Sequence, residues 1–198
     1  RSSDLAEHDA ESVWWADFTA LCAALLPQAA GGIAAVCVSG IGPCLLPADE
    51  EGRPLRPAIL YGIDTRATRE IEELTAQYGA DTMLARGGSL LTSQAVGPKL
   101  AWLRRNEPDV WARTRYFFMA NSFITYRLTG EYVLDQHSAS QCDPLYDMQT
   151  NSWIAEWAAE IAPGLELPRL LWPAETAGTV TPAAAQATGI PAGTPVAA

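Results

Sequence analysis

The sequence predicts an α/β fold with a parallel or mixed sheet. Short runs of apolar, partly β-branched residues alternate along the whole chain with segments in which apolar residues keep helical spacing. One almost unbroken apolar run, residues 33–38, is typical of a central strand that is covered on both faces. With 198 residues, of which 48% are hydrophobic and 18% are charged, the chain is long enough for one buried core, or for a core with a small appendage.

The first half of the chain is predicted to alternate between helices and strands. A helix is expected where apolar residues follow a helical period and Pro27 then ends the segment. A strand pair is expected where two apolar runs flank the acidic turn at 49–52. In order, the expected elements are a core-facing helix over 13–26, the central strand over 33–38, a hairpin or strand pair over 44–61, a helix over 65–78, and a Gly- and Ser-rich connection over 84–98.

The second half continues the alternation. Pro98 is expected to start a helix, because proline suits the first helical position, and Asn121 or Ser122 is expected to cap the helix over 121–128. The expected elements after the Pro98 helix are a short helix from 107, a strand over 116–119, the helix over 121–128, a strand over 132–134, a helix over 153–161, a strand over 178–180, a helix over 182–188, and a last strand over 194–198.

Charge and hydropathy exclude two classes of partner. The formal net charge is -10, and the thirteen basic residues are scattered, whereas a nucleic-acid surface needs clustered Lys and Arg to neutralise phosphates. The longest apolar runs are far shorter than the roughly 20 residues that span a bilayer. We therefore expect neither nucleic acid nor a membrane as a partner.

The four cysteines indicate free thiols in a reducing cytoplasm. They form no C-x-x-C pair and no metal-like spacing with the two histidines, so no metal site is predicted in this chain. The cysteines are Cys22, Cys37, Cys44 and Cys142, and the histidines are His8 and His137.

A polar cluster directly follows the predicted strand at 132–134. Asp135 would emerge at the end of that strand, where open sheets bind their ligands, and the next residues could hydrogen-bond a polyhydroxylated molecule. Alternatively, Asp135 or Ser138 caps a short helix and His137 is a solvated surface residue. The pattern by itself leaves both interpretations open.

Five motifs occur in a characteristic order and cover nearly the whole chain. They are Glu7-His8-Asp9 followed by Trp14-Trp15; Val38-Ser39-Gly40; residues 52–61 leading to Asp64-Thr65-Arg66; Gly97-Pro98-Lys99-Leu100-Ala101-Trp102; and Leu128-Thr129-Gly130-Glu131 leading to Asp135 and Ser138-Ala139-Ser140. Together they resemble the N-terminal domain of the FGGY family of carbohydrate kinases, most of all its xylulokinase-like branch.

The resemblance implies an actin-like ATPase or ribonuclease-H-like domain, with a mixed central sheet flanked by helices. It is one of two domains that close over ATP, Mg²⁺ and a sugar, and that transfer the γ-phosphoryl group to a hydroxyl of a ketose or polyol. The alternative is a non-catalytic actin-like module that binds a sugar or a partner protein. A dinucleotide-binding domain is set aside, because no G-x-G-x-x-G follows a strand.

The resemblance also implies which residues bind the substrate. Gly42 and Pro43 occupy the positions where typical xylulokinases carry a Met-His pair that contacts the sugar, so a ketose or polyol other than D-xylulose stays open. The expected substrate-binding residues are Asp64, Arg66, Asp135, His137, Gly42, Pro43 and Trp15.

Asp64 and a further candidate, Lys99, have plainer alternatives, and Trp15 is preferred to its neighbour Trp14. Asp64 could cap the helix after Thr65 and form a surface pair with Arg66. Aromatic faces often enclose sugars, and Trp15 is expected to do so here, whereas Trp14 fits the core face of its helix. Lys99, which lies in the first turn of a helix, either contacts a phosphate or is exposed.

The resemblance further implies that functional parts lie outside this chain. The chain opens without Met and closes in the first half of a predicted strand, so we expect a segment of a longer protein. Residues 1–198 would be the sugar-binding N-terminal domain, without the glycine-rich phosphate hairpin, which would precede Arg1, and without the C-terminal nucleotide domain. The general-base Asp is expected after Ala198, so no catalytic residue is assigned here, and the isolated segment is expected to be inactive. A homodimer is possible.

Overall fold

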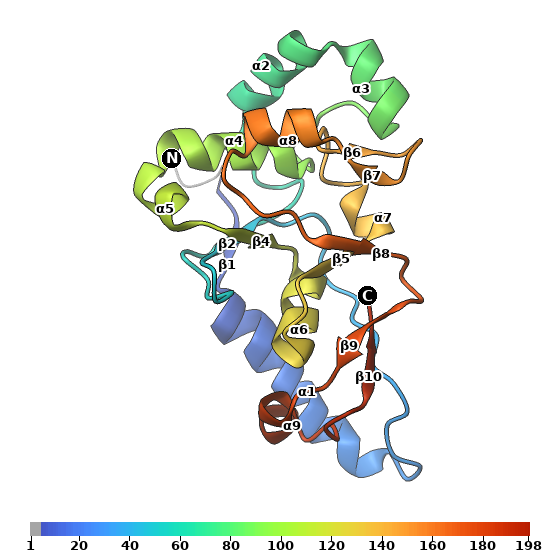
Figure 1. The fold of residues 1–198 in the computed structure, drawn as a ribbon. Helices are drawn as coiled ribbons and strands as arrows, with labels where there is room; N and C mark the ends of the chain where they lie inside the picture. The colour runs from blue at the N-terminus through green and yellow to red at the C-terminus, as the bar shows by residue number, and fades with distance from the viewer. Residues whose placement is uncertain (1–4) are drawn as a thin grey trace.

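The computed structural model describes residues 5–198, in which helices and short strands alternate (Figure 1). In chain order the elements are β1 (Glu7–His8), η1 (Ala10–Trp15), α1 (Ala16–Leu25), η2 (Leu26–Gln28), β2 (Leu46–Ala48), β3 (Ala58–Ile59), α2 (Thr68–Tyr78), α3 (Ala80–Gly87), α4 (Val96–Asn106), α5 (Pro108–Arg113), β4 (Tyr116–Phe118), α6 (Ala120–Thr129), β5 (Val133–Asp135), α7 (Gln136–Ala139), β6 (Tyr146–Asp147), β7 (Ser152–Trp153), α8 (Ala155–Ile161), β8 (Arg169–Leu171), β9 (Thr176–Thr179), α9 (Pro182–Thr188) and β10 (Pro195–Ala197).

The strands pair two by two. β5 and β8 run parallel, whereas the pairs β1–β3, β2–β4, β6–β7 and β9–β10 are antiparallel. Isolated bridges join Leu45 to Ile59 and Val36 to Val196. The predicted α/β class with mixed strand directions is therefore confirmed, although the strands form small pairs and not one wide sheet.

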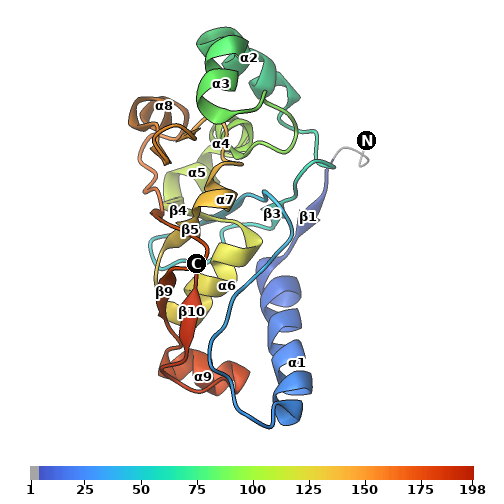
Figure 2. The same cartoon turned by 90° about the vertical axis from the view of Figure 1, so that its right-hand side faces the viewer.

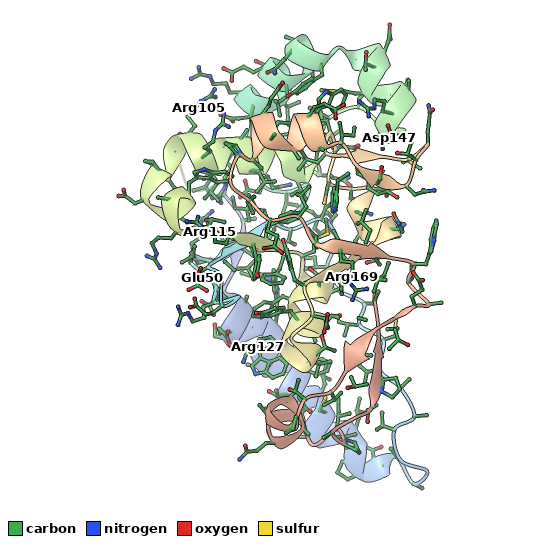
Figure 3. The ribbon with its side chains drawn as sticks, viewed as in Figure 1. Glu50, Arg105, Arg115, Arg127, Asp147 and Arg169 are labelled. Atoms are coloured by element: carbon green, nitrogen blue, oxygen red, sulfur yellow. The ribbon has the colours of Figure 1, made fainter. Side chains whose placement is uncertain are left out.

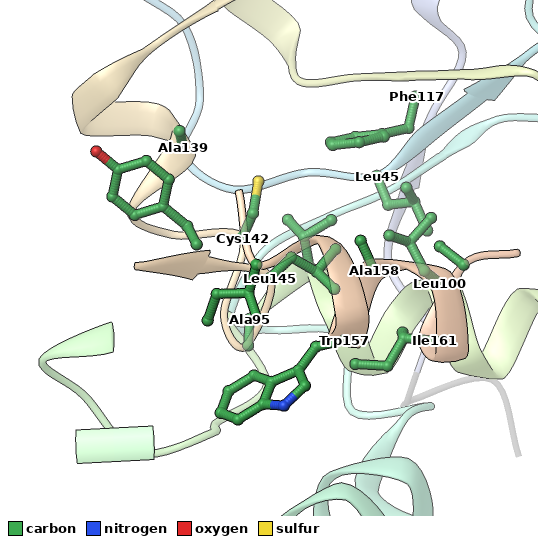
Figure 4. Close-up of a cluster of buried hydrophobic side chains, with 14 of the residues drawn as sticks. Leu45, Ala95, Leu100, Phe117, Ala139, Cys142, Leu145, Trp157, Ala158 and Ile161 are labelled. Atoms are coloured by element: carbon green, nitrogen blue, oxygen red, sulfur yellow. The ribbon is translucent and has the colours of Figure 1, made fainter. Parts of the chain in front are cut away.

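The β2–β4 pair separates two hydrophobic cores. Successive side chains of a strand point to opposite faces, and the buried neighbours Phe117 and Phe118 of β4 accordingly belong to different cores. The same holds for Leu45 and Leu46 at β2. The first core, with Leu100, lies among α2, α3, α4 and α8, and Figure 4 shows part of it. The second core lies among η1, α6, α9 and the adjoining strands (Figure 1).

The segment 33–38 is not the predicted central strand. Its one bridge is the parallel contact of Val36 with Val196, and Figure 2 shows it as an extended chain between α1 and β10. A strand needs a continuous ladder of backbone hydrogen bonds, and residues 5–198 supply that ladder at a single position. The prediction of a buried, two-sided strand is therefore wrong for this structure.

The predicted helix over 13–26 exists and packs against the second core through Trp14, Phe18 and Cys22, but part of its apolar face is not covered. It is divided into η1, α1 and η2, and α1 buries none of its residues. Leu21 and Leu25 are each 59% exposed and line a groove of about 420 Å³ together with Val36. Apolar spacing identified the helix correctly, but it could not show how much of its apolar face is covered.

Two further predictions differ in detail. Residues 80–87 form α3, so residues 84–87 are helical and not part of the predicted connection over 84–98. Met83 packs into the first core, and Gly88, at φ 80°, ends the helix in the left-handed conformation. Helix α6 begins at Ala120, and the Met119 N–H donates to Ser122 Oγ over 3.0 Å. Asn121 is therefore inside the helix and does not cap it.

Other predicted elements are confirmed within a few residues, as the bounds of α2, α4, α5, β4, β5, α8, β9, α9 and β10 show. The predicted strand pair over 44–61 is joined only by isolated antiparallel bridges, because β2 pairs with β4 and β3 pairs with β1. In residues 5–198, no helix has both the length and the apolar composition needed to cross a membrane.

The labelled arginines in Figure 3, which are Arg105, Arg115, Arg127 and Arg169, are spread along the molecule, and three of them form ion pairs with carboxylates.

Candidate functional site

Residues at the ends of strands line a cavity of about 310 Å³ between the two cores. Asp135 ends β5, Met119 follows β4, and Ala198 follows β10. The loop 37–42 supplies the opposite wall. This position agrees with the rule that open α/β sheets bind ligands beyond the carboxyl ends of their strands.

The loop 39–42 lies directly against the start of α6. A Cβ added at Gly40 would lie 2.9 Å from the backbone nitrogen of Asn121, which is closer than real Cβ contacts, and 3.0 Å from Ala120 Cβ, which is a tight contact. Only glycine lets the loop approach the helix at this point. Gly42, by contrast, has ordinary space around it, since its nearest neighbour is the Tyr61 ring at 3.7 Å.

Asp135 is held by a compact hydrogen-bond network. Its side chain is buried, with 6% of the residue exposed, and Oδ1 accepts from the backbone N–H of Ser138 over 2.9 Å, which caps α7. Oδ2 accepts from Nδ2 of Asn121 over 3.0 Å, and the same nitrogen lies 3.1 Å from Ser138 Oγ. The capping interpretation is therefore correct, and both carboxylate oxygens already have partners.

The polar groups of this cavity are mostly neutral. Asn121, Ser138 and Gln141 carry amide or hydroxyl groups, Asp135 is the carboxylate, and His137 is exposed at the margin. Neither Lys nor Arg is among the lining residues. Such a set of neutral donors and acceptors suits a polyhydroxylated molecule better than an anion.

Asp64 and Arg66 do not line this cavity. Their side chains form a buried bidentate pair, in which Nε and one terminal nitrogen of Arg66 donate to Asp64 over 2.8 and 2.7 Å. Arg66 also pairs with Glu7 over 2.7 Å, and its guanidinium lies 4.9 Å from the centre of the Trp102 ring. The pair joins β1 to the start of the α2 region.

This geometry also corrects the alternative for Asp64. Helix α2 begins at Thr68 and has no side-chain cap, and the Asp64–Arg66 pair is buried and not on the surface. Burial acts to raise the pKa of Asp64, but the hydrogen bonds from Arg66 and from the Ala6 N–H outweigh it and hold that pKa below its usual range. The structure therefore gives the pair a structural role.

Trp15 and Pro43 also lie outside the Asp135 cavity. Trp15 stacks on Phe18, with 5.8 Å between the ring centres, and the Arg127 guanidinium lies 4.5 Å from the Trp15 ring centre. Pro43 lines a neighbouring cavity, whereas Gly42 lines the Asp135 cavity itself. Of the predicted substrate-binding residues, the structure thus brings together Gly42, Asp135 and His137.

Lys99 is neither exposed nor placed at a ligand site. It is 1% exposed, and Nζ donates to the carbonyl oxygens of Ser93, Gln94 and Ala95 over 2.7, 3.0 and 3.2 Å. Burial lowers the pKa of Lys99 to about 8. Its role is to hold the loop before α4, and both sequence-based interpretations of Lys99 are wrong.

Sequence reasoning missed Asn121 and Gln141 as cavity residues. Asn121 was assigned as a helix cap, and no motif distinguishes Gln141 from a surface residue. Only the approach of α6 to the turn after α7 brings both side chains to the cavity.

A metal site does not emerge from the described residues. No three His, Cys, Asp or Glu side chains in residues 5–198 gather into a group that could hold a metal ion. The donor set that Mg²⁺ prefers, several oxygen ligands together, is therefore not formed by this part of the protein, and no chemical step is assigned to a metal here.

Comparison with known proteins identifies the family. Residues 1–198 match the family model described as the FGGY family of carbohydrate kinases, N-terminal domain. This chain belongs to that family. The actin-like fold of FGGY sugar kinases is accordingly the fold of this chain, and the resemblance deduced from its five motifs is confirmed.

Known FGGY proteins are similar to this chain both in sequence and in structure. The xylulose kinase of Streptomyces rubiginosus is 35% identical over 175 residues, which cover 84% of this chain and 34% of that protein. The glycerol kinase of Nocardia farcinica is 31% identical over 183 residues, covering 88% and 36%. The crystal structure of xylulose kinase from Rhodospirillum rubrum superposes with a TM-score of 0.89 at 32% identity, covering 98% of this chain and 40% of that one. The chain thus spans well under half the length of these FGGY relatives.

Proposed function

We propose that this chain is the sugar-binding part of an ATP-dependent carbohydrate kinase, which phosphorylates a hydroxyl of a ketose or polyol. The observation that supports it most is the neutral polar cavity at the strand ends, in a chain of the FGGY family. Proteins named xylulose kinase and glycerol kinase are among its relatives, which favours a small polyhydroxylated substrate. The four free cysteines are compatible with a cytoplasmic location.

The residues of this chain would bind and orient the sugar. In this proposal, the amide of Asn121 and the hydroxyl of Ser138 contact sugar hydroxyls. Asp135 holds the two residues in place by accepting from the Asn121 side chain and from the Ser138 backbone N–H. Because both Asp135 oxygens already accept hydrogen bonds, we propose that Asp135 orients the site and does not accept the proton of the attacking hydroxyl.

The phosphoryl donor and the general base would come from other parts of the protein. Transfer of a phosphoryl group requires a carboxylate in line with the hydroxyl and a cation near the transferred phosphate. The cavity offers no cationic cluster, and both carboxylate oxygens of its Asp135 are engaged. We therefore propose that ATP, Mg²⁺ and the base approach from outside residues 1–198.

The experiment measures ATP consumption by the whole protein with a panel of ketoses and polyols. We expect sugar-dependent turnover, and a fall of about tenfold or more in kcat/KM for Asn121→Ala. Asn106→Ala is the matched control, because Asn106 is an exposed amide at the end of α4 that does not line the cavity. Binding of a sugar without any turnover would replace the proposal with a non-catalytic sugar-binding module. If the protein neither binds nor turns over any sugar of the panel, the proposal is refuted.

A further inference from the structure

A second cavity, of about 360 Å³, adjoins the Asp135 cavity. Gln141 lines both cavities. Of two adjacent loop residues, Gly42 lines the Asp135 cavity and Pro43 lines the second cavity. The two cavities are therefore neighbours on either side of one side chain. We call the second one the Asp143 cavity, after its carboxylate.

Asp143 has one carboxylate oxygen without a partner. The residue is 6% exposed, and Oδ2 accepts a hydrogen bond from Ser89 Oγ over 2.5 Å. Oδ1 accepts none from residues 5–198 and lies over Gly87, at the place where any larger residue would carry its Cβ. Oδ1 is not among the fully buried atoms that lack a partner, so it stays accessible, and its free lone pairs suit it to accept from a hydroxyl group of a ligand.

The protonation of Asp143 is consistent with such a role. Burial raises the pKa of this carboxyl to about 6, although the hydrogen bond from Ser89 acts to lower it. At neutral pH Asp143 is therefore largely ionised, and a hydrogen bond from a neutral hydroxyl group stabilises the carboxylate. An anionic ligand would add a second negative charge beside it.

The lining of the Asp143 cavity selects a neutral ligand. No Lys, Arg or His is among its residues, so a phosphate or carboxylate would face Asp143 without a compensating cation. The other polar groups are hydroxyls and amides that can exchange hydrogen bonds with sugar hydroxyls. They belong to Ser89, Thr92, Gln94, Ser140 and Gln141.

We propose that the Asp143 cavity holds the hydroxyl-bearing tail of a substrate whose reacting end lies in the Asp135 cavity. This inference rests on the proposed kinase function and narrows it to a ketose or polyol with a longer carbon chain than a pentulose. The tail passes Gln141, and one of its hydroxyls donates to Asp143 Oδ1.

The test compares kcat/KM of the whole protein for ketoses of five, six and seven carbons. We expect wild-type protein to favour the longer ketoses. Asp143→Asn keeps the shape of the side chain but weakens the acceptor, and it should lower the ratio of kcat/KM for the seven-carbon ketose to that for the five-carbon ketose about tenfold.

Gly87→Ala gives an independent variant that leaves the carboxylate intact. Its new methyl group would lie against Asp143 Oδ1, so the same ratio should fall. Asp81→Asn is the control, since Asp81 is an exposed carboxylate on the same helix, α3, and does not line the cavity. Thermal unfolding of each variant separates misfolding from a change in selectivity.

The outcomes distinguish this inference from the proposed function. Absence of turnover with every sugar would overturn the kinase proposal and this inference with it. Turnover that favours the five-carbon ketose, with a ratio that neither variant changes, would overturn the inference alone. A ratio that falls in both folded variants but not in Asp81→Asn would support it.

Discussion

The side-chain amide of Asn121 donates to Asp135 Oδ2 over 3.0 Å, and this bond joins the first turn of α6 to the end of β5. The same nitrogen reaches Ser138 Oγ at 3.1 Å, so one amide organises the start of two helices. The wall of the candidate sugar site thus depends on a contact between residues from different elements.

The Asn121 contact should be more sensitive to charge than to truncation. Asn121→Ala removes two hydrogen bonds and is expected to lower the free energy of unfolding by about 1 kcal/mol. Asn121→Asp places a second carboxylate beside buried Asp135 and should cost about 2 kcal/mol or more at neutral pH, because like charges repel in a buried site. Urea unfolding of the whole protein measures both, and equal losses would contradict this explanation.

Two glycines of the loop 39–42 should respond differently to alanine. Gly40→Ala would force a methyl group to within 2.9 Å of the Asn121 backbone nitrogen, so we expect a loss of about 1–3 kcal/mol. Gly42→Ala meets only ordinary contacts with the Tyr61 ring, so its effect should stay within about 0.5 kcal/mol. The same unfolding measurement on the two variants checks the close approach of loop and helix.

The Asp64–Arg66 pair should contribute to stability and not to sugar contact. Arg66→Met leaves the buried Asp64 carboxylate without its main partner, and is expected to cost about 3 kcal/mol. Arg69→Met is the matched control, because it breaks an exposed pair with Glu73 and should cost less than about 0.5 kcal/mol. A selective rise in the sugar KM of correctly folded Arg66→Met would instead return Arg66 to the substrate site.

The same pair predicts an acid dependence of stability. The pKa of Asp64 is lower in the folded protein than its usual value, so its stabilising contribution is complete above the unfolded pKa of about 3.9. That contribution is lost as the pH falls through the folded pKa. The difference in unfolding free energy between wild type and Asp64→Asn should therefore be constant from pH 6 to about 5 and shrink below about pH 4.

For Lys99 we expect a pH dependence of the unfolding free energy in the alkaline range. Burial lowers its pKa to about 8, against about 10.4 in an unfolded chain, so between these values the unfolded state binds more protons. The contribution of Lys99 to stability should therefore rise with pH through this window. The measurement compares the unfolding free energies of wild type and Lys99→Met at pH 7 and at pH 10. The difference between the two proteins isolates the contribution of Lys99, because the other groups that titrate at alkaline pH are common to both.

At neutral pH, Lys99→Met should destabilise the protein by about 1–3 kcal/mol, because three carbonyl oxygens lose their donor. The loop at 93–95 borders the Asp143 cavity, so its hydrogen exchange should increase in this variant. Unchanged exchange there would show that the loop is held by other contacts.

Much of the fold could be predicted from the sequence. Apolar periodicity and terminal residues identified most elements from α2 to β10, and the order of five motifs identified the family. These are local properties, since helical spacing, turn residues and short motifs can be read within about ten to fifteen residues. The polar cluster after β5 and its position at a strand end were also correctly predicted.

Other features depend on partners that are distant in sequence. Residues 33–38 have the composition of a central strand, yet within residues 5–198 they form one bridge, and Leu21 and Leu25 of α1 stay exposed. Asp64 and Arg66 form a polar motif typical of a binding site, but the approach of Glu7 and Trp102 makes them a buried structural pair. Periodicity does not report which surface covers which side chain.

The sequence by itself determined the α/β class, the family and the polar character of the β5 end, because these follow from local pattern and motif order. Only the tertiary structure decided that Asn121 and Gln141 join Asp135, that Lys99 is buried against three carbonyls, and that a second cavity opens beside Asp143. The physical reason is that a cavity and its hydrogen bonds are made by surfaces that meet only after the two cores have packed.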